Sequence, residues 1–271
     1  EHDFKVISSA LGAQAFVDEL EAEDDMTQVL IGNPVNTTTQ RLDPILRMIR
    51  ARRSMMGMRY DQLSSGLHTY QVSRALSIEE NPFLYDHRIH GHAVLPATCA
   101  LAWMVNICEQ LYPGFIFTHC EEFEVLAGIV FDEHLAERYM LSLRELSKMA
   151  DPDAIVFECL ISSASDRRQR NHYHALITIT RQLPDSPIYA DFDRDDANGF
   201  PIASAYADGT LFHGPSFQGA EYVLNSGEHK LTMRCNLAPL DLERQGQFPV
   251  QSFNPYVADA CAHGALLWMR N

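Results

Sequence analysis

The strongest constraint on the fold is one apolar helical run that is followed by a series of strand-like segments. Residues 97–111 form an apolar stretch of helical length, and Pro113-Gly114 ends it. Four segments rich in β-branched, aromatic or leucine residues come next, at 116–132, 138–146, 154–163 and 172–181. One buried helix before several antiparallel strands predicts an α+β fold in which a sheet wraps around the helix.

The second half of the sequence contains the same kinds of element, an apolar helix and several strands. Strand candidates come first and an apolar helix follows, at 204–210, 221–225, 230–236 and 256–269. Only two residues follow Met269, so the strands that follow the first helix have no counterpart here. We therefore expect a second helix-and-sheet unit that is incomplete at its C-terminal end.

The organisation along the chain follows from changes in composition. The first residues carry a short helix-and-strand pattern of their own, and a polar, irregular stretch follows it. A later stretch, residues 184–201, is acidic and holds three prolines and one glycine, which is typical of a linker. The predicted parts are a short N-terminal piece, a linker, an N-terminal unit, a second linker and a C-terminal unit, at 1–32, 33–66, 67–183, 184–201 and 202–271.

Charge and cysteine usage exclude some classes of protein. The chain has 36 acidic and 21 basic side chains and a formal net charge of −15, which argues against a nucleic-acid binder or a protein of anionic membranes. No apolar run approaches the roughly 18 residues of a membrane span. The six cysteines are scattered without a CxxC pair, so we expect a reduced, cytoplasmic setting.

Three short motifs carry side chains suited to acid–base chemistry. His87, Gly91 and Pro96 form an HxxxGxxxxP pattern directly before the first apolar helix. The second motif begins at His213-Gly214-Pro215, before the second-half strands at 221–225 and 230–236. The third places Asp259 and His263 four residues apart, on one face of the second helix.

Together and in this order, the motifs resemble the dehydratase domains of polyketide and polyunsaturated fatty acid synthases. The resemblance covers about residues 67–271 and implies a double hotdog, two sheets each wrapped on a central helix. Residues 1–32 resemble the closing segment of a ketoreductase domain, as found upstream in such synthases. The implied activity is that of a 3-hydroxyacyl-[acyl-carrier-protein] dehydratase, a hydro-lyase.

The resemblance also implies partners. The substrate would be carried on the phosphopantetheine of an acyl carrier protein, with no other cofactor and no metal. The acyl carrier protein and neighbouring synthase domains are the expected partners, and a homodimer is an arrangement that the resemblance allows. Neither nucleic acid nor a membrane is expected.

Dehydration needs a base for the α-proton and a proton donor for the β-hydroxyl. Histidine titrates near neutral pH, and an aspartate in apolar surroundings can keep its proton because desolvation disfavours its charged form. By the resemblance, His87 is the base and Asp259 the acid. His263 would orient Asp259 or the departing water.

Other residues of the motifs are expected to bind the substrate. Pro96 and Ala97 open the first helix, so the Ala97 amide is the candidate donor to the thioester oxygen. Gly91 would permit a tight turn that brings His87 over the helix start. His213-Gly214-Pro215 stands where the family usually has Tyr-Gly-Pro. The aromatic hydroxyl lines the site in relatives, and an imidazole there could still donate a hydrogen bond.

Several alternatives remain open at the level of the sequence. His87 could be a structural histidine, or could share a metal with His90 and His92, although no carboxylate or thiolate stands at a standard ligand spacing. A non-catalytic module that organises neighbouring domains would keep the same fold. An isomerase or cyclase could use the same His/Asp pair. Cys99 and Cys261 are most simply core residues, Trp268 is most simply a core or tunnel-lining residue, and the arginines at 47–53 and 167–170 could dock a carrier protein.

Overall fold

A computed structural model describes residues 66–270, except 151–152, 166–167, 186–187 and 190–192. The described residues all belong to one compact region of the chain, residues 49–271. The predicted N-terminal piece, 1–32, and all but the last residue of the first predicted linker therefore lie outside the described residues. So do the arginines between 47 and 53.

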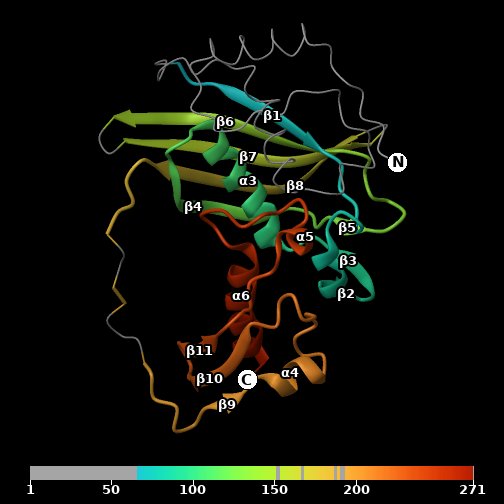
Figure 1. Cartoon of the computed structure of the whole chain (residues 1–271), viewed down its shortest axis with the longest axis vertical. Helices are drawn as coiled ribbons and strands as arrows, with labels where there is room; N and C mark the ends of the chain where they lie inside the picture. The colour runs from blue at the N-terminus through green and yellow to red at the C-terminus, as the bar shows by residue number, and fades with distance from the viewer. Residues whose placement is uncertain (1–65, 151–152, 166–167, 186–187, 190–192, 271) are drawn as a thin grey trace, which may run out of the picture. The chain divides into compact units, whose positions relative to one another are not determined.

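The N-terminal unit is built on a five-stranded antiparallel sheet, with helix α3 (Ala97–Leu111) packed against it (Figure 1). Helix α3 has the bounds that the sequence predicts. The strand order is β1 (Thr69–Arg74), β6 (Tyr139–Ala150), β7 (Asp153–Ser165), β8 (Arg168–Thr180) and β4 (Ile116–Val125). The order of apolar segments predicts this arrangement, in which a sheet wraps around a helix.

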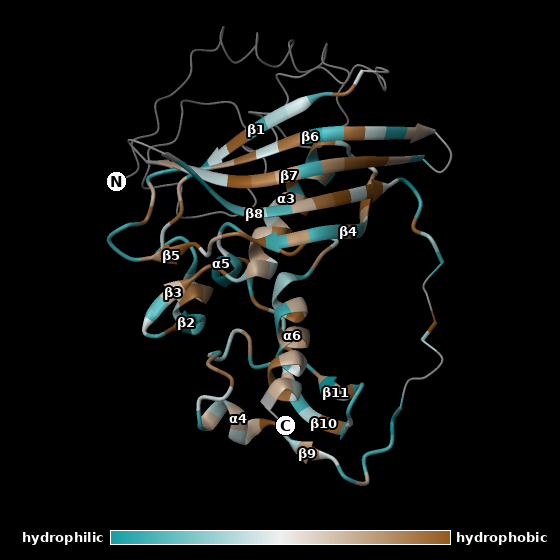
Figure 2. Ribbon diagram, turned by 180° about the vertical axis from the view of Figure 1, so that it is seen from behind, coloured by the Kyte–Doolittle hydropathy of each residue, from teal (hydrophilic) through white to brown (hydrophobic). Residues whose placement is uncertain are grey.

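Alternating side chains explain why the sheet closes on the helix. Buried residues alternate with less buried ones along much of β6, β7 and β8, and Figure 2 shows hydrophobic stretches on all three strands. Strand β7 buries every second residue completely, at Ile155, Phe157, Cys159 and Ile161. The facing side of α3 buries a matching set that includes Trp103 and Met104. Burying each large apolar side chain contributes about 1.5–3 kcal/mol, so this layer holds the unit together.

A small three-stranded sheet lies next to the start of α3. It consists of β2 (Arg88–Ile89), β3 (His92–Val94) and β5 (Val130–Phe131), in that order. A short 3₁₀ helix, η2 (Pro82–Asp86), comes directly before it. The turn between β2 and β3 places His90 and Gly91 at positive φ, which confirms the tight turn expected at Gly91.

The C-terminal unit repeats the plan on a smaller scale. Its sheet has the order β11 (Leu231–Cys235), β10 (Ala220–Ser226), β9 (Phe200–Pro201), and α6 (Pro255–Arg270) packs on β10 and β11. A short helix, α5 (Leu242–Gln245), lies before α6. Residues 200–201, predicted as the end of the second linker, pair with β10 as strand β9. Figure 2 shows hydrophilic residues along most of the preceding connection.

One predicted strand is wrong. Residues 204–210 were expected to be extended, but Ala203–Ala207 form the helix α4. The segment is short and contains Tyr206 and Thr210, residue types that are common in strands. Alanine is a strong helix former, and the helical turn lets Ala205 and Tyr206 pack against a small cluster around Ile202 and Leu211.

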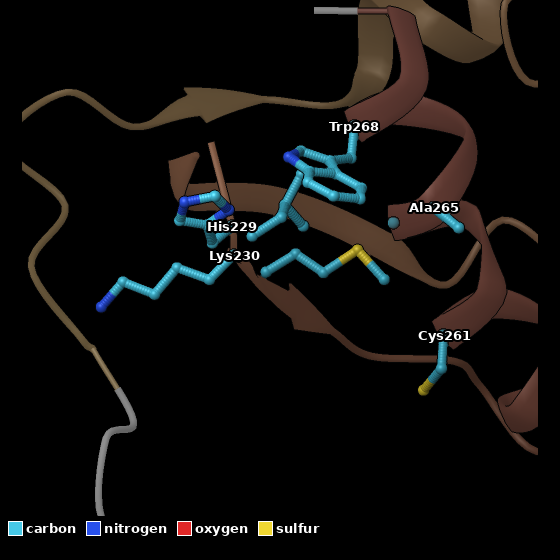
Figure 3. A pocket seen from close by; sticks show the side chains of 8 residues that line it. His229, Lys230, Cys261, Ala265 and Trp268 are labelled. Atoms are coloured by element: carbon cyan, nitrogen blue, oxygen red, sulfur yellow. The ribbon is translucent and has the colours of Figure 1, made fainter. Parts of the chain in front are cut away.

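Helix α6 is exposed on one side, contrary to the prediction that Cys261 is a core residue. Cys261 is exposed and the side chain of Trp268 is 42% exposed, whereas Cys99 on α3 is fully buried. Both exposed residues line a hollow between α6 and β11, together with His229, Lys230 and Met233 (Figure 3). Within the described residues β11 is the edge of its sheet, so no further strand covers this side of α6.

An aromatic cluster joins the two units. The ring of Phe83, on η2, lies 5.5–6.2 Å from the rings of Phe217, Phe248 and Tyr256, in edge-to-face arrangements. Helices α3 and α6 also contact each other. This packing brings the start of α6 against the segment that leads into His87. None of the described helices is long and apolar enough to cross a membrane.

Candidate active site

His87 follows η2 directly and is held by the neighbouring hairpin. Its Nδ1 lies 2.7 Å from the carbonyl oxygen of Val94, and the Val94 amide donates back to the His87 carbonyl at 3.1 Å. A carbonyl only accepts, so Nδ1 carries the proton and Nε2 keeps a free lone pair. Burial lowers the pKa of His87, although the nearby Asp259 acts in the opposite sense. The ring is therefore a neutral base near pH 7.

Asp259 lies on α6 and points its carboxyl group at two imidazoles. Its Oδ2 is 3.4 Å from Nε2 of His213 and 3.4 Å from Nε2 of His263. No described group hydrogen-bonds this oxygen. The other oxygen, Oδ1, accepts from the Thr98 hydroxyl at 3.5 Å. Asp259 is only 8% exposed, so an unpartnered oxygen here is costly unless a ligand or substrate uses it.

His263 is oriented by a hydrogen-bond chain from the second sheet. The Ala220 amide donates to the Tyr206 hydroxyl at 3.1 Å, and that hydroxyl lies 3.0 Å from Nδ1 of His263. The hydroxyl can then donate its own proton to Nδ1, which places the ring proton on Nε2, facing Asp259. This geometry fits the positioning role expected for His263.

His213 completes the cluster from the loop after α4. Its ring centre is 5.2 Å from that of His87, 4.0 Å from that of His263 and 3.8 Å from that of Phe212, on which it stacks. Burial, with a smaller effect of His263, lowers the pKa of His213 to about 3. The ring is therefore neutral near pH 7, and no described group hydrogen-bonds its Nδ1.

A clamp centred on Asp86 fixes the loop that carries His213. The Gly214 amide donates to the Asp86 carbonyl at 2.7 Å, and the Ser216 amide donates to the Asp86 carboxylate at 3.0 Å. The Ser216 hydroxyl and, at 3.2 Å, the Arg244 guanidinium donate to the same carboxylate oxygen. A β-carbon on Gly214 would lie 2.5 Å from Oδ1 of Asp86, so this position requires glycine.

The structure brings four of the predicted site residues together and separates others. His87, His213, Asp259 and His263 are all buried and adjacent. Pro96 caps α3 and Ala97 is its first residue, next to Thr98. Gly91 and Pro215 are exposed, as are His90 and His92, the alternative metal ligands. Gly91 therefore shapes the hairpin that holds His87, and Pro215 the loop that holds His213.

Sequence reasoning missed the residues that support the cluster. Thr98 contacts Asp259, Tyr206 contacts His263, and Asp86, Ser216 and Arg244 form the clamp. The only sequence signals were the position of Asp86 directly before His87 and that of Ser216 inside the second motif. Tyr206 lay in a segment predicted as a strand, and Arg244 lies between the predicted segments 230–236 and 256–269.

Comparisons with known proteins agree with this architecture. Residues 57–159 match the family model described as the polyketide synthase dehydratase domain. A polyunsaturated fatty acid synthase of Thraustochytrium sp. is 27% identical over 209 residues, 76% of this chain and 7% of that protein. Polyketide synthase GfsB of Streptomyces halstedii is 26% identical over 200 residues, 71% of this chain and 3% of that protein. The chain thus spans under a tenth of these curated relatives.

A solved structure supports the same fold. The dehydratase domain from the CurF module of the curacin polyketide synthase superposes with a TM-score of 0.52 at 17% identity, covering 76% of this chain and 72% of that one. The architecture is therefore α+β and of the double-hotdog class, as the motifs led us to expect. Residues 57–159 thus resemble the polyketide synthase dehydratase family in sequence, and the described residues share the fold of a solved dehydratase domain.

Proposed function

We propose that this domain removes water from 3-hydroxyacyl thioesters carried on the phosphopantetheine of an acyl carrier protein. The observation that carries the proposal is the approach of two groups from different units. A neutral His87 with a free Nε2 lies beside Asp259. A ring nitrogen of His87 lies within 4.8 Å of a carboxylate oxygen of Asp259. One group can accept a proton while the other gives one, which is what an elimination requires.

The step balances with these two residues alone. His87 Nε2 takes the α-proton, and the electron pair of the broken C–H bond forms the carbon–carbon double bond. The β-carbon–oxygen bond breaks as the Asp259 carboxyl protonates the departing hydroxyl, which leaves as water. The imidazolium and carboxylate so formed attract each other, in agreement with the effect of Asp259 on the pKa of His87.

The start of α3 is positioned to stabilise the thioester oxygen. Ala97 is the first helical residue, so its N–H has no acceptor within the helix. The helix dipole adds positive potential at this end, which favours the negative charge that develops on the oxygen. Thr98 is the next residue of α3, and its hydroxyl contacts Asp259. The proposed oxyanion donor, the Ala97 amide, is therefore connected through Thr98 to the proposed proton donor, Asp259.

His213 is proposed to line the pocket for the β-hydroxyl. It is neutral and lies 3.4 Å from the oxygen of Asp259 that lacks a partner. A hydroxyl placed between them would satisfy the unpartnered oxygen. We also propose that the acyl carrier protein and adjacent synthase domains are the partners, and that the domain uses no cofactor besides the carrier's phosphopantetheine.

The test is an assay of the purified chain with 3-hydroxyacyl thioesters of pantetheine and of an acyl carrier protein. Formation of the conjugated enoyl thioester is followed by its ultraviolet absorption. His87→Ala and Asp259→Asn should abolish turnover, and the exposed His92→Ala, in the same hairpin, should retain it. Turnover that survives His87→Ala, in a protein with the wild-type circular dichroism, would overturn the proposal. A folded wild type without turnover on either substrate would favour a non-catalytic module.

A further inference from the structure

Three ligand-type side chains from separate segments converge at the junction of the two units. His87 follows η2, His213 lies in the loop after α4, and Asp259 is on α6. Their ligand atoms all lie within 4.8 Å of one another, and each residue is more than nine-tenths buried. We infer that His87, His213 and Asp259 form a binding site for a divalent transition-metal ion of the zinc class.

The donor set and its spacing suit such an ion. Two imidazole nitrogens and one carboxylate oxygen are ordinary ligands of zinc, which is usually four-coordinate and tetrahedral. Bonds of about 2.0–2.1 Å in a tetrahedron separate neighbouring ligand atoms by about 3.3 Å. His213 Nε2 and Asp259 Oδ2 are 3.4 Å apart, so this edge of the tetrahedron already exists. The ligand atom of His87 lies within 4.8 Å of the other two and must move closer to complete the face.

The lone pairs required for binding are available. The Val94 carbonyl takes the Nδ1 proton of His87, which directs the free Nε2 into the cluster. This is the outer hydrogen bond that metal-bound histidines usually make. No described group hydrogen-bonds Oδ2 of Asp259, so binding an ion would break no existing hydrogen bond at this atom.

Neighbouring groups support the ligands. His263 points its Nε2 at the same oxygen of Asp259, and Tyr206 holds the other nitrogen of that ring. A carboxylate oxygen has two lone pairs, so it can bind the ion and face His263 together. The loop of His213 is fixed by the Asp86 clamp and by Gln218, whose amide donates to the His213 carbonyl at 2.9 Å. The three ligands leave a fourth position for a water molecule.

Metal binding and the proposed dehydration exclude each other. The ion takes the lone pair that His87 uses as a base and the carboxyl that Asp259 uses as an acid. Bound Zn²⁺ therefore inhibits turnover reversibly. This inhibition rests on the proposed function, whereas the inference of a metal-binding site is independent of it.

The binding test uses the full chain, freed of metal by a chelator and by desalting. CoCl₂ is added without substrate, and the visible d–d absorption of four-coordinate cobalt is recorded; ZnCl₂ should then displace the cobalt. Calorimetry with ZnCl₂ gives the affinity of wild type and variants. Loss of an outer partner costs roughly 10–100-fold in affinity, so His213→Phe and Asp259→Asn, which each remove a ligand, should cost more than this.

Matched controls separate this site from adventitious binding. His119→Ala removes an imidazole that is 60% exposed, and Cys261→Ser removes an exposed thiol, so both should keep the wild-type affinity. Unchanged affinity in folded His213→Phe and Asp259→Asn, or no saturable binding by the wild type, would overturn the inference. Because a ligand variant could unfold, X-ray absorption of the wild-type cobalt complex gives a second test. Nitrogen and oxygen ligands are expected, and a sulfur ligand would contradict the site.

The assay distinguishes failure of this inference from failure of the proposed function. Addition of ZnCl₂ should stop enoyl formation, and a chelator should restore it. A chain that binds cobalt through these residues but never dehydrates a thioester supports the metal site and contradicts only the proposed function. A chain that dehydrates the thioester and binds no metal contradicts only the metal site.

Discussion

Nδ1 of His87 lies 2.7 Å from the carbonyl oxygen of Val94, so a residue seven positions further along the chain selects which nitrogen of His87 is free. The acceptor is a backbone atom of β3, whose partner strand β5 fixes its position. No side chain is needed for this selection. The base of the proposed reaction is therefore prepared by the path of the backbone, and the turn at Gly91 is what allows that path.

The Asp86 clamp should contribute to both stability and turnover. Asp86→Ala removes the acceptor of the Ser216 amide, the Ser216 hydroxyl and the Arg244 guanidinium. Hydrogen bonds to a charged group contribute about 1.5–3 kcal/mol each, with incomplete additivity, so we expect a loss of roughly 2–4 kcal/mol in the free energy of unfolding. Urea unfolding measures it, with the exposed Asp185→Ala as control. A loss no larger than that of the control would contradict the clamp.

Tyr206 should act through His263 rather than on the substrate. Tyr206→Phe removes the hydroxyl that faces Nδ1 of His263, so the ring proton is free to change nitrogen. We expect turnover to fall about tenfold, which corresponds to about 1.4 kcal/mol. The ¹⁵N chemical shifts of the His263 ring should change as well, which a purely structural role would not require. Tyr222→Phe on β10 is the matched control. Unchanged ring signals in Tyr206→Phe would exclude this mechanism.

Local signals were sufficient to predict the main elements of the fold. Pro96 and Pro113-Gly114 lie at the two ends of α3, and the strand-like runs of β6 to β8 are long enough to predict strands. The segment around Tyr206 was predicted wrongly, because five residues are too few for their pattern to distinguish a strand from a helical turn. The exposure of Cys261 was also missed, since an apolar helix gives no sign of which of its faces is covered.

The candidate site was predictable only in part, for a different reason. His87, Asp259 and His263 stand in short motifs, and the spacing of the last two fixes their common helix face. The approach of His213 to Asp259 depends on a loop held by Asp86, which is distant in sequence. Such contacts arise from packing between units, and no periodicity in the sequence encodes them.

Gly214 should tolerate no side chain while Asp86 is present. In Gly214→Ala the new β-carbon would lie 2.5 Å from Oδ1 and 2.9 Å from Cβ of Asp86. Overpacking of this kind costs about 1–3 kcal/mol, so urea unfolding should show a loss in that range. Gly227→Ala is the control, because the nearest atom to its added β-carbon is 3.9 Å away. The cost of Gly214→Ala should shrink in an Asp86→Ala background; an equal cost in both backgrounds would refute the clash.

Acid should destabilise the fold through His172, which lies outside the site. His172 is 4% exposed and is held by the Ala127 carbonyl and the Ser163 hydroxyl, and burial lowers its pKa. In the unfolded chain histidine titrates near about 6.5. Below that pH the unfolded chain binds a proton that the folded chain refuses, until the pH falls through the lower folded pKa. The free energy of unfolding should therefore decrease on acidification, by up to about 1.4 kcal/mol per pH unit for this residue.

Urea unfolding between about pH 7.5 and 5.5 measures this decrease. His172→Gln keeps a donor for the Ala127 carbonyl and an acceptor for the Ser163 hydroxyl but cannot titrate, so its stability should depend less on pH than that of the wild type. His92→Gln changes an exposed histidine and should leave the wild-type dependence in place. If His172→Gln loses stability with acid as steeply as the wild type does, the acid sensitivity belongs to other groups, of which the buried His87 and His213 have lowered pKa values of the same sign.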